Sequence, residues 1–265
     1  MVGFPTGFLF HKSMQRRAFS LTGLLVLGYH GSARGADAQP IVVEDRKYRG
    51  KSWNCLRLDL SKHPLRLFQS GEDGKPLRNF EALERNVAKQ GRRVVVAMNA
   101  GMFEEDGSPV GWCVADGKLI KGPNTDQGEG NFFLKPNGIF AIQNGRALVR
   151  ETGAAIGTLD KATLITQSGP LLVTAGRLHP AFRENSANLH IRNAVGVGTD
   201  GSVWLALSAE PVNFHESATL FRDELGCPDA LFLDGVVSQL HVPGLGRKGG
   251  VAALGPLLAV TEAAG

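Results

Sequence analysis

Alternating apolar and polar positions along most of the chain predict strands. Residues 53–60 alternate with the period of two that is typical of a half-buried strand, and residues 93–98 form a nearly continuous apolar run, as in a buried strand. Further strands are predicted at residues 65–68, 194–198, 202–207 and 230–233. Glycine accepts the positive φ of tight hairpin turns. Such turns are predicted at Asp106-Gly107, Asp116-Gly117, Asn137-Gly138, Asn144-Gly145 and Thr199-Asp200-Gly201.

Helical periodicity is clear in only two segments. In the first, which Pro76 opens and Gly91 closes, the apolar residues Phe80, Leu83, Val87 and Ala88 lie on one helical face. The second is predicted to begin at Asn213, which can cap it, with Glu216 in the capping-box position, and to end at Gly226. Strands therefore dominate, and the pattern predicts an α+β fold: a single domain with a strand-rich mixed sheet and a few packed helices.

The first 38 residues have the features of an export signal. Arg16 and Arg17 precede a short apolar run, residues 18–27, and Ala36-Asp37-Ala38 provides a small-x-small cleavage site. The run is about half the roughly 20 residues needed to span a bilayer, so a transmembrane helix is not expected. The two arginines and the residues after them also resemble a twin-arginine signal.

Removal of this segment would leave residues 39–265 as the mature domain, in the periplasm or secreted, without a transmembrane anchor. The whole chain has 29 Lys and Arg against 25 Asp and Glu, a formal net charge of +4. Four of the basic residues and only one acidic residue lie in the first 38 positions. The mature domain is therefore nearly neutral, and this argues against a nucleic-acid partner.

Three cysteines, Cys55, Cys113 and Cys227, are an odd number, and none of their spacings is that of a zinc or redox site. Two states stay open from the sequence: one disulfide with one free thiol, or three buried thiols.

Polar residues stand next to the ends of several predicted strands, where a sheet edge can hold chemical groups rigidly. Asn99 follows residues 93–98 and Asp234 follows residues 230–233. The others are Gln167, Ser168, Arg192, Asn193 and Glu210. Each of these alone is most simply a turn former or a cap, and Asp234-Gly235 is most simply a turn. The sequence has no nucleophile elbow, phosphate-binding loop or metalloprotease histidine pair, so the strand ends are the candidate site.

Six short segments occur in the order that is found in one known family. They are residues 98–103 (MNAGMF), 131–133 (NFF), 167–170 (QSGP), 192–197 (RNAVGV), 213–215 (NFH) and 233–238 (LDGVVS). Together they resemble the phosphodiester glycosidase family, and in particular a bacterial branch linked to exopolysaccharide. The resemblance covers about residues 50–250. It implies an α+β fold and hydrolysis of a sugar 1-phosphodiester in cell-envelope or exopolysaccharide glycan metabolism.

This reaction suggests a role for each candidate residue. Because phosphate departs as a weak base, the site needs donors for the phosphate and a carboxylate, but little proton donation to the leaving oxygen. Arg192 is the candidate phosphate clamp, since its planar guanidinium matches phosphate oxygens in a bidentate manner. Asp234 is the candidate base or nucleophile, with Asn99 as an orienting donor and His215 as a proton shuttle or an assistant to Arg192. The substrate-binding candidates are Ser238, Gly235, Gln167, Ser168, Glu210 and Asn213, with Glu210 also the candidate second carboxylate and His190 a weaker candidate.

One segment departs from the family's pattern. The family usually has Asp-Gly-Gly-Gly-Ser where this chain has Asp234-Gly235-Val236-Val237-Ser238. Glycine lets a ligand approach the backbone closely, so the two valines would narrow that approach and change the substrate or abolish activity.

Two alternatives stay open from the sequence. A non-catalytic glycan-binding module of the cell envelope would also explain the valines, although aromatic residues, which stack on sugar rings, are only 7% of the chain. No cofactor is assigned, and a divalent cation such as calcium stays open. Asp106, Asp116 and Asp200 lie in glycine-containing turns and are expected to be turn formers. The expected partner is a carbohydrate or a sugar phosphodiester.

Overall fold

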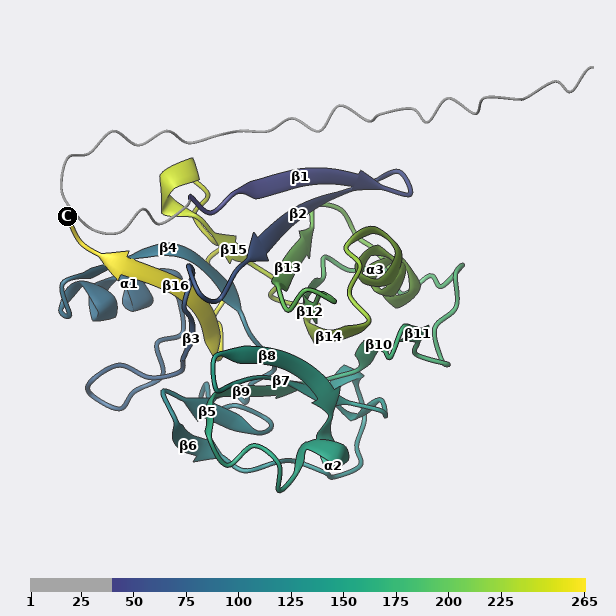
Figure 1. Ribbon diagram of the computed structural model, residues 1–265, viewed down its shortest axis with the longest axis horizontal. Coiled ribbons are helices and arrows are strands. Elements are labelled where there is room, and N and C mark those ends of the chain that lie inside the picture. Colours follow the sequence, from purple (N-terminus) through teal and green to yellow (C-terminus); the bar gives the residue numbers. More distant parts are fainter. Residues whose placement is uncertain (1–39) are drawn as a thin grey trace, which may run out of the picture.

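The computed structural model describes residues 40–265, and its strands form three sheets in which every pairing is antiparallel (Figure 1). The predicted export segment, residues 1–38, lies outside the described residues. The largest sheet has seven strands, in the order β1 (Val43–Tyr48), β2 (Lys51–Leu58), β13 (Val203–Ser208), β12 (Asn193–Val197), β14 (Asp229–Asp234), β10 (Leu171–Thr174) and β11 (Arg177–Leu178).

The other two sheets are smaller. The four-stranded sheet has the order β15 (Leu240–His241), β4 (Arg92–Asn99), β16 (Leu257–Ala263) and β3 (Leu65–Phe68). The five-stranded sheet has the order β6 (Lys118–Lys121), β5 (Cys113–Ala115), β9 (Ala162–Ser168), β7 (Gly138–Gln143) and β8 (Arg146–Glu151). The strands predicted from alternation are therefore present, but the hydrogen-bonded ladders divide them among three sheets.

Both predicted helices are present, with shifted bounds. The first, α1 (Phe80–Ala88), begins at Asn79, whose side chain accepts a hydrogen bond from the backbone N–H of Ala82. The second, α3 (Phe214–Thr219), begins at Asn213 and continues as a π-helix, η2 (Leu220–Glu224). The remaining helical segments are short: α2 (Thr152–Ala155), η1 (Asn131–Phe133) and η3 (Pro243–Leu245). Across residues 40–265, no helix has the length and apolar character needed to cross a membrane.

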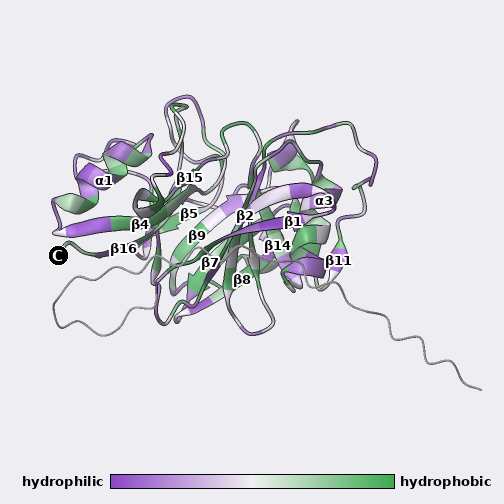
Figure 2. Cartoon of the chain, turned by 90° about the horizontal axis from the view of Figure 1, so that it is seen from above, coloured by the Kyte–Doolittle hydropathy of each residue, from purple (hydrophilic) through white to green (hydrophobic). Residues whose placement is uncertain are grey.

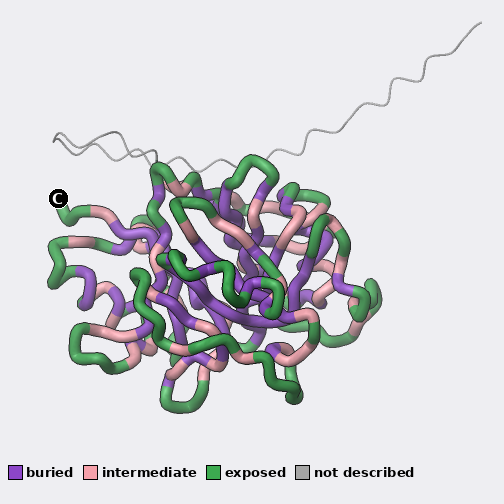
Figure 3. The backbone as a smooth tube through the Cα atoms, turned by 60° about the horizontal axis from the view of Figure 1, so that its bottom comes forward, coloured by how far each residue is buried: buried purple, intermediate pink, exposed green. Residues whose placement is uncertain are grey.

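One hydrophobic core joins the three sheets. It contains Leu56 of β2, Met98 of β4 and Phe140 of β7, all fully buried. The helix α3 and η2 cover the outer face of the seven-stranded sheet, and α1 covers that of the four-stranded sheet. Hydrophobic residues gather along the central strands (Figure 2), and the exposed residues lie mainly in the connecting loops (Figure 3). A shared core confirms the strand-rich, single-domain α+β fold.

Most of the predicted hairpin turns are confirmed. Asp116-Gly117 joins β5 to β6 and Asn144-Gly145 joins β7 to β8, and all four residues have positive φ. The prediction for Asn137-Gly138 is wrong. Asn137 is buried, with its side-chain Nδ2 donating to the carbonyl of Phe132 and its Oδ1 accepting from the Thr152 hydroxyl, and Gly138 begins β7. These side-chain hydrogen bonds hold an internal loop and not a tight turn.

The three cysteines are free and buried. Cys55 and Cys227 lie in the core beneath α3, and Cys113 lies in the core shared by the sheets. Burial raises the pKa of each of the three thiols to about 12. Since the thiolate is the reactive form, all three are expected to be inert in the folded protein.

This structure predicts the reactivity of the thiols. Purified protein incubated with a thiol reagent at about pH 8, without reductant, should label no cysteine while folded and all three in guanidinium chloride. Intact-mass spectrometry of both samples gives the count. A protein with one disulfide would label only one cysteine after unfolding, and this would contradict the free-thiol state.

Candidate functional site

The carboxylate of Asp234 lies at the end of β14 and is only 5% exposed. Its Oδ1 accepts hydrogen bonds from the backbone N–H groups of Val236, at 2.8 Å, and Val237, at 3.2 Å. Its Oδ2 accepts from Nδ2 of Asn99 at 3.1 Å. Several donors therefore hold the carboxylate in one orientation, largely out of water.

Burial raises the pKa of Asp234 above its ordinary value of 3.8, although the hydrogen bonds from Asn99 and from the turn after β14 act in the opposite direction. A general base gains efficiency as its pKa moves toward the working pH. The environment of Asp234 therefore suits a proton-accepting role.

The Asn99 side chain is itself fixed by two donors. Nδ2 of Asn193 donates to Oδ1 of Asn99 at 3.0 Å and to the Asn99 carbonyl at 2.7 Å, and the backbone N–H of Gln239 donates to the same Oδ1 at 2.8 Å. Because Oδ1 accepts both bonds, Nδ2 of Asn99 faces Asp234. The Ser238 hydroxyl lies 3.2 Å from Oδ1 of Asn193 and 2.8 Å from the Asp234 carbonyl. Asn193 is fully buried, and the sequence indicated it by its place at a strand start and within the family-like segment 192–197.

The guanidinium of Arg192 is buried, with the residue only 1% exposed. Nε donates to the carbonyl of Val212 at 2.9 Å, and Nη2 donates to the carbonyl of Asn188 at 3.0 Å and to its side-chain Oδ1. The guanidinium carbon lies 3.8 Å from the ring centre of Phe214 and 5.3 Å from that of Phe232. Burial lowers the pKa of Arg192 to about 10, so the group stays charged at neutral pH.

The third nitrogen, Nη1, is buried and has no hydrogen-bond partner. No Asp or Glu among residues 40–265 forms an ion pair with Arg192. A Cβ at Gly235 would lie 3.2 Å from Nη1, so the main chain next to Asp234 packs directly against this nitrogen. A buried charge without a counter-ion is costly. The arrangement therefore favours an anionic ligand at the turn that carries Asp234.

The two valines do not strain this turn. Neither has a positive φ, and their N–H groups are the donors to Asp234. The side chain of Val236 is directed to solvent, with the residue 88% exposed. Valine is therefore compatible with the carboxylate geometry, and its side chain adds an apolar group outside the site.

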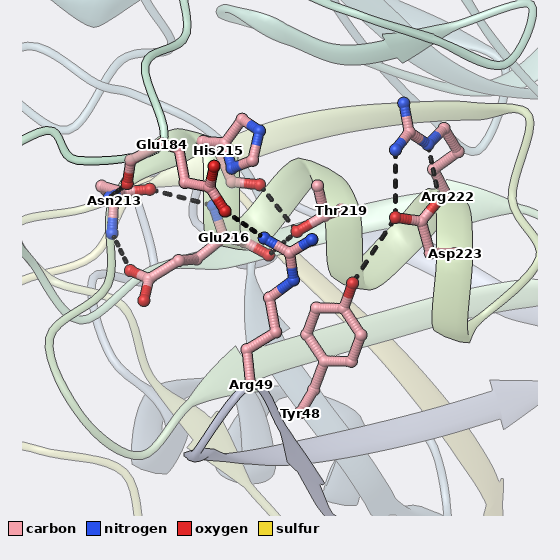
Figure 4. Close-up of polar contacts among 9 residues, drawn as sticks. All are labelled: Tyr48, Arg49, Glu184, Asn213, His215, Glu216, Thr219, Arg222 and Asp223. Carbon is pink, nitrogen blue, oxygen red and sulfur yellow. Dashed lines mark hydrogen bonds and ion pairs between the residues drawn. The ribbon is translucent and has the colours of Figure 1, made fainter.

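Asn213 caps α3 as predicted. Its Oδ1 accepts from the N–H of Glu216 at 2.9 Å, and its own N–H donates to the Glu216 carboxylate at 2.8 Å (Figure 4). Nδ2 of Asn213 also donates to the carbonyl of Glu184 at 2.9 Å. His215 lies on the first turn of α3, next to Phe214, and its Nδ1 is buried without a partner. Asn213 therefore fixes the helix and loop on which the Arg192 contacts depend.

The tip of the β1–β2 hairpin holds the same loop from outside. Arg49 forms an ion pair with Glu184 at 2.9 Å, and the Tyr48 hydroxyl lies 3.5 Å from the Asp223 carboxylate (Figure 4). Glu184 precedes Asn188, which binds Arg192. The hairpin thus supports the loop that covers the guanidinium.

Other predicted site residues lie elsewhere. Glu210 accepts from the N–H of Ser52 at 3.2 Å and lies 3.9 Å from the Lys51 ammonium, at the start of β2. Because β13 and β12 lie between β2 and β14 in their sheet, two strands separate the contact of Glu210 with β2 from Asp234. His190 is exposed, and its main chain forms an isolated antiparallel β-bridge with that of Val212.

Gln167 and Ser168 are buried and serve the frame of the site. Oε1 of Gln167 accepts from the N–H groups of Trp112, at 2.8 Å, and Asn124, at 2.9 Å, and so fixes the loop around β5 and β6. The Ser168 hydroxyl donates to the carbonyl of Leu233 at 3.0 Å and ties β9 to the end of β14. Neither side chain lies among the donors to Asp234.

The three turn aspartates have partners of their own. Asp106 accepts from the N–H of Ser108 at 2.8 Å, Asp200 accepts from that of Ser202 at 3.0 Å, and Asp116 pairs with Arg66. Their role as turn formers is as predicted. Within residues 40–265, no three His, Cys, Asp or Glu side chains converge as ligands for a metal ion.

The raised pKa of Asp234 predicts a pH-dependent stability. The folded chain binds the proton of the Asp234 carboxyl group more tightly than the unfolded chain does. Protonation of Asp234 therefore stabilises the fold fully below the ordinary pKa, and this stabilisation is lost as the pH rises through the folded-state pKa. Asn at position 234 does not titrate, so the Asp234→Asn protein does not lose stability in this way. Its melting temperature relative to the parent, measured by circular dichroism, should therefore rise as the pH increases above the ordinary pKa of 3.8. A difference that does not change with pH would contradict the raised pKa.

Comparisons with known proteins identify the family of the chain. The sequence pattern of the phosphodiester glycosidase family matches residues 92–249, more than half of the chain and the range that holds Asn99, Arg192 and Asp234. The uncharacterized protein YigE of Escherichia coli (strain K12) is 29% identical over 180 residues, which are 68% of this chain and 70% of that protein.

Among solved structures, the fold is similar to the catalytic domain of zebrafish N-acetylglucosamine-1-phosphodiester alpha-N-acetylglucosaminidase, auto-inhibited by its pro-peptide. The similarity has a TM-score of 0.60 at 16% identity and covers 83% of this chain and 81% of that one. At this identity the structural likeness shows the fold alone, whereas the sequence match shows the family. The family supports a general role as a hydrolase of phosphodiester-linked sugars, and the chain belongs to the phosphodiester glycosidase family.

Proposed function

We propose that the mature protein is an exported hydrolase that cleaves a sugar 1-phosphodiester in cell-envelope or exopolysaccharide glycan metabolism. The observation that carries this proposal is the buried Arg192, whose Nη1 has no partner and lies against the turn of the buried carboxylate of Asp234. In a sugar 1-phosphodiester, the phosphate is an anion that Arg192 can bind, and the sugar has a reacting carbon on which Asp234 can act. The export features of residues 1–38 support a place outside the cytoplasm.

In this reaction Arg192 binds one phosphate oxygen through Nη1. The protein already uses Nε and Nη2, so the contact is made by a single nitrogen and not by the bidentate fork expected from the sequence. Its charge stabilises the negative charge that grows on the phosphate as the bond from the sugar carbon to the phosphate oxygen breaks. Nη1 faces the main chain at Gly235, which lies next to the carboxylate of Asp234.

Asp234 acts on the sugar carbon, either by accepting the proton of the attacking water or as the nucleophile. Asn99 keeps one carboxylate oxygen in place while the other faces the turn. Among residues 40–265, Asp234 is the carboxylate of this site, because Glu210 binds the N–H of Ser52 instead. Most glycoside hydrolases use a pair of carboxylates. A phosphate leaving group needs no carboxylic acid to protonate it, so one carboxylate suffices.

The decisive experiment follows release of free sugar from a panel of sugar 1-phosphodiesters and ordinary glycosides. The proposal expects turnover of a phosphodiester and not of the matching glycosides. Calorimetric binding of the same compounds without any turnover would support a glycan-binding module instead.

Asp234→Asn should lower kcat by about 10²–10⁴-fold, since the amide cannot accept a proton. Glu210→Gln, the same change at the distant carboxylate, should leave kcat near that of the parent. A folded Asp234→Asn protein with parental turnover would remove Asp234 from the mechanism.

Arg192→Lys keeps the charge but loses the contacts of Nε and Nη2, so kcat/KM for the phosphodiester should fall about 100-fold or more. Arg222→Lys, on the exposed side of η2, is the matched control. Melting curves of both variants separate lost activity from lost folding. Normal kcat/KM in a folded Arg192→Lys protein would make Arg192 a structural residue only.

A further inference from the structure

A cavity of about 400 Å³ lies between the first turn of α1 and the segment that follows β15. Both elements pack against β4, the strand that ends at Asn99 (Figure 1). The walls are formed by Phe80, Glu81, Glu84, His241, Lys248 and the main chain at residues 249–251. None of these residues belongs to the site at Asp234.

The wall of this cavity is built around His241, which is 5% exposed. Its ring stacks on Phe80, with the ring centres 5.0 Å apart and the planes inclined by 9°. Nε2 of His241 lies 3.0 Å from the carboxylate of Glu84, whose side chain is 41% exposed, and Nδ1 is buried without a partner. The carboxylate of Glu84 is therefore held at the wall by a buried imidazole and remains open to a ligand.

The loop that faces His241 approaches the ring of Phe80 without side chains. A Cβ at Gly249 would lie 2.3 Å from Phe80 and 2.9 Å from Oε1 of Gln239. That Oε1 is also buried without a partner. Gln239 lies behind this loop and does not line the cavity, so the unsatisfied polar atom among the lining residues is Nδ1 of His241.

The same chain segment connects the cavity to the site. The N–H of Gln239 binds Asn99, and His241 pairs with Ala97, two residues before Asn99 on β4. Two residues of strand and the 3.1 Å contact from Asn99 to Asp234 put His241 on the order of 10 Å from the carboxylate. This is a distance that one chain of linked sugars can span.

The charges around the cavity indicate the kind of group that it binds. Glu81 and Glu84 offer two carboxylates, against one ammonium group from Lys248, so the walls disfavour an anion. A carboxylate accepts hydrogen bonds well from hydroxyl groups, and charge-assisted bonds of this type are strong. The site at Arg192, by contrast, favours an anion.

We propose that this cavity is a second subsite, which binds a neutral, hydroxyl-rich sugar unit of the same glycan whose phosphodiester is held at Arg192 and Asp234. This inference rests on the proposed function. It makes the substrate an extended glycan and not an isolated sugar phosphate.

The test compares two phosphodiesters with the same reacting sugar, one with a methyl group as its only substituent and one extended by a neutral trisaccharide. The measured quantity is the ratio of kcat/KM for the extended substrate to that for the methyl substrate. Glu84→Gln keeps an acceptor for His241 and should lower this ratio about tenfold, mainly through KM. Lys248→Ala, on the opposite wall, should lower it by a smaller factor.

Glu72→Gln, an exposed carboxylate in a different cavity, is the matched control and should keep the parental ratio. A ratio unchanged in Glu84→Gln would overturn the subsite. If neither phosphodiester is turned over, the proposed function fails. In that case, calorimetry with the neutral trisaccharide alone tests the subsite. The subsite requires that the trisaccharide binds the parent protein and binds Glu84→Gln more weakly. Absence of binding to the parent protein would overturn the subsite.

Discussion

The candidate site depends on side-chain hydrogen bonds that join the three sheets at the end of β14. Asn193 on the seven-stranded sheet donates to Asn99 at the end of the four-stranded sheet. Ser168 on the five-stranded sheet donates to the carbonyl of Leu233, next to Asp234. Each of these side chains is buried, so each bond must be made if the sheets are to meet at this point. The carboxylate is therefore placed by the junction of the sheets and not by the flexibility of one loop.

Asp234 and Arg192, the two charged groups at this junction, each bind other partners and do not pair with one another. Asp234 is surrounded by N–H donors, and Arg192 by carbonyl oxygens and by the faces of Phe214 and Phe232. They form no ion pair with one another. Since neither neutralises the other, both stay available to a substrate that carries an anion beside an electrophilic carbon.

Local features of this fold could be predicted from the sequence, because they depend on neighbouring residues. The cap at Asn213, the turns at Asp116-Gly117 and Asn144-Gly145, and the strand that ends at Asp234 are of this kind. The cap of the first helix, Asn79, was not predicted, and the helix begins after it and not at Pro76. The way in which strand ends are brought together could not be predicted, since it is set by pairing between distant strands. Glu210 and Asp234 both follow apolar strands, yet the order of the sheet separates them. The prediction of a tight turn at Asn137-Gly138 is wrong for a similar reason, since the side chain of Asn137 forms hydrogen bonds with Phe132 and Thr152.

The free, buried state of Cys55, Cys113 and Cys227 determines the conditions under which the protein can fold. No covalent cross-link between cysteines holds the three sheets together, so the fold rests on its core and on the hydrogen bonds at the sheet junction. The native state can then be reached under reducing as well as oxidising conditions. Folding therefore needs no thiol oxidase or disulfide isomerase.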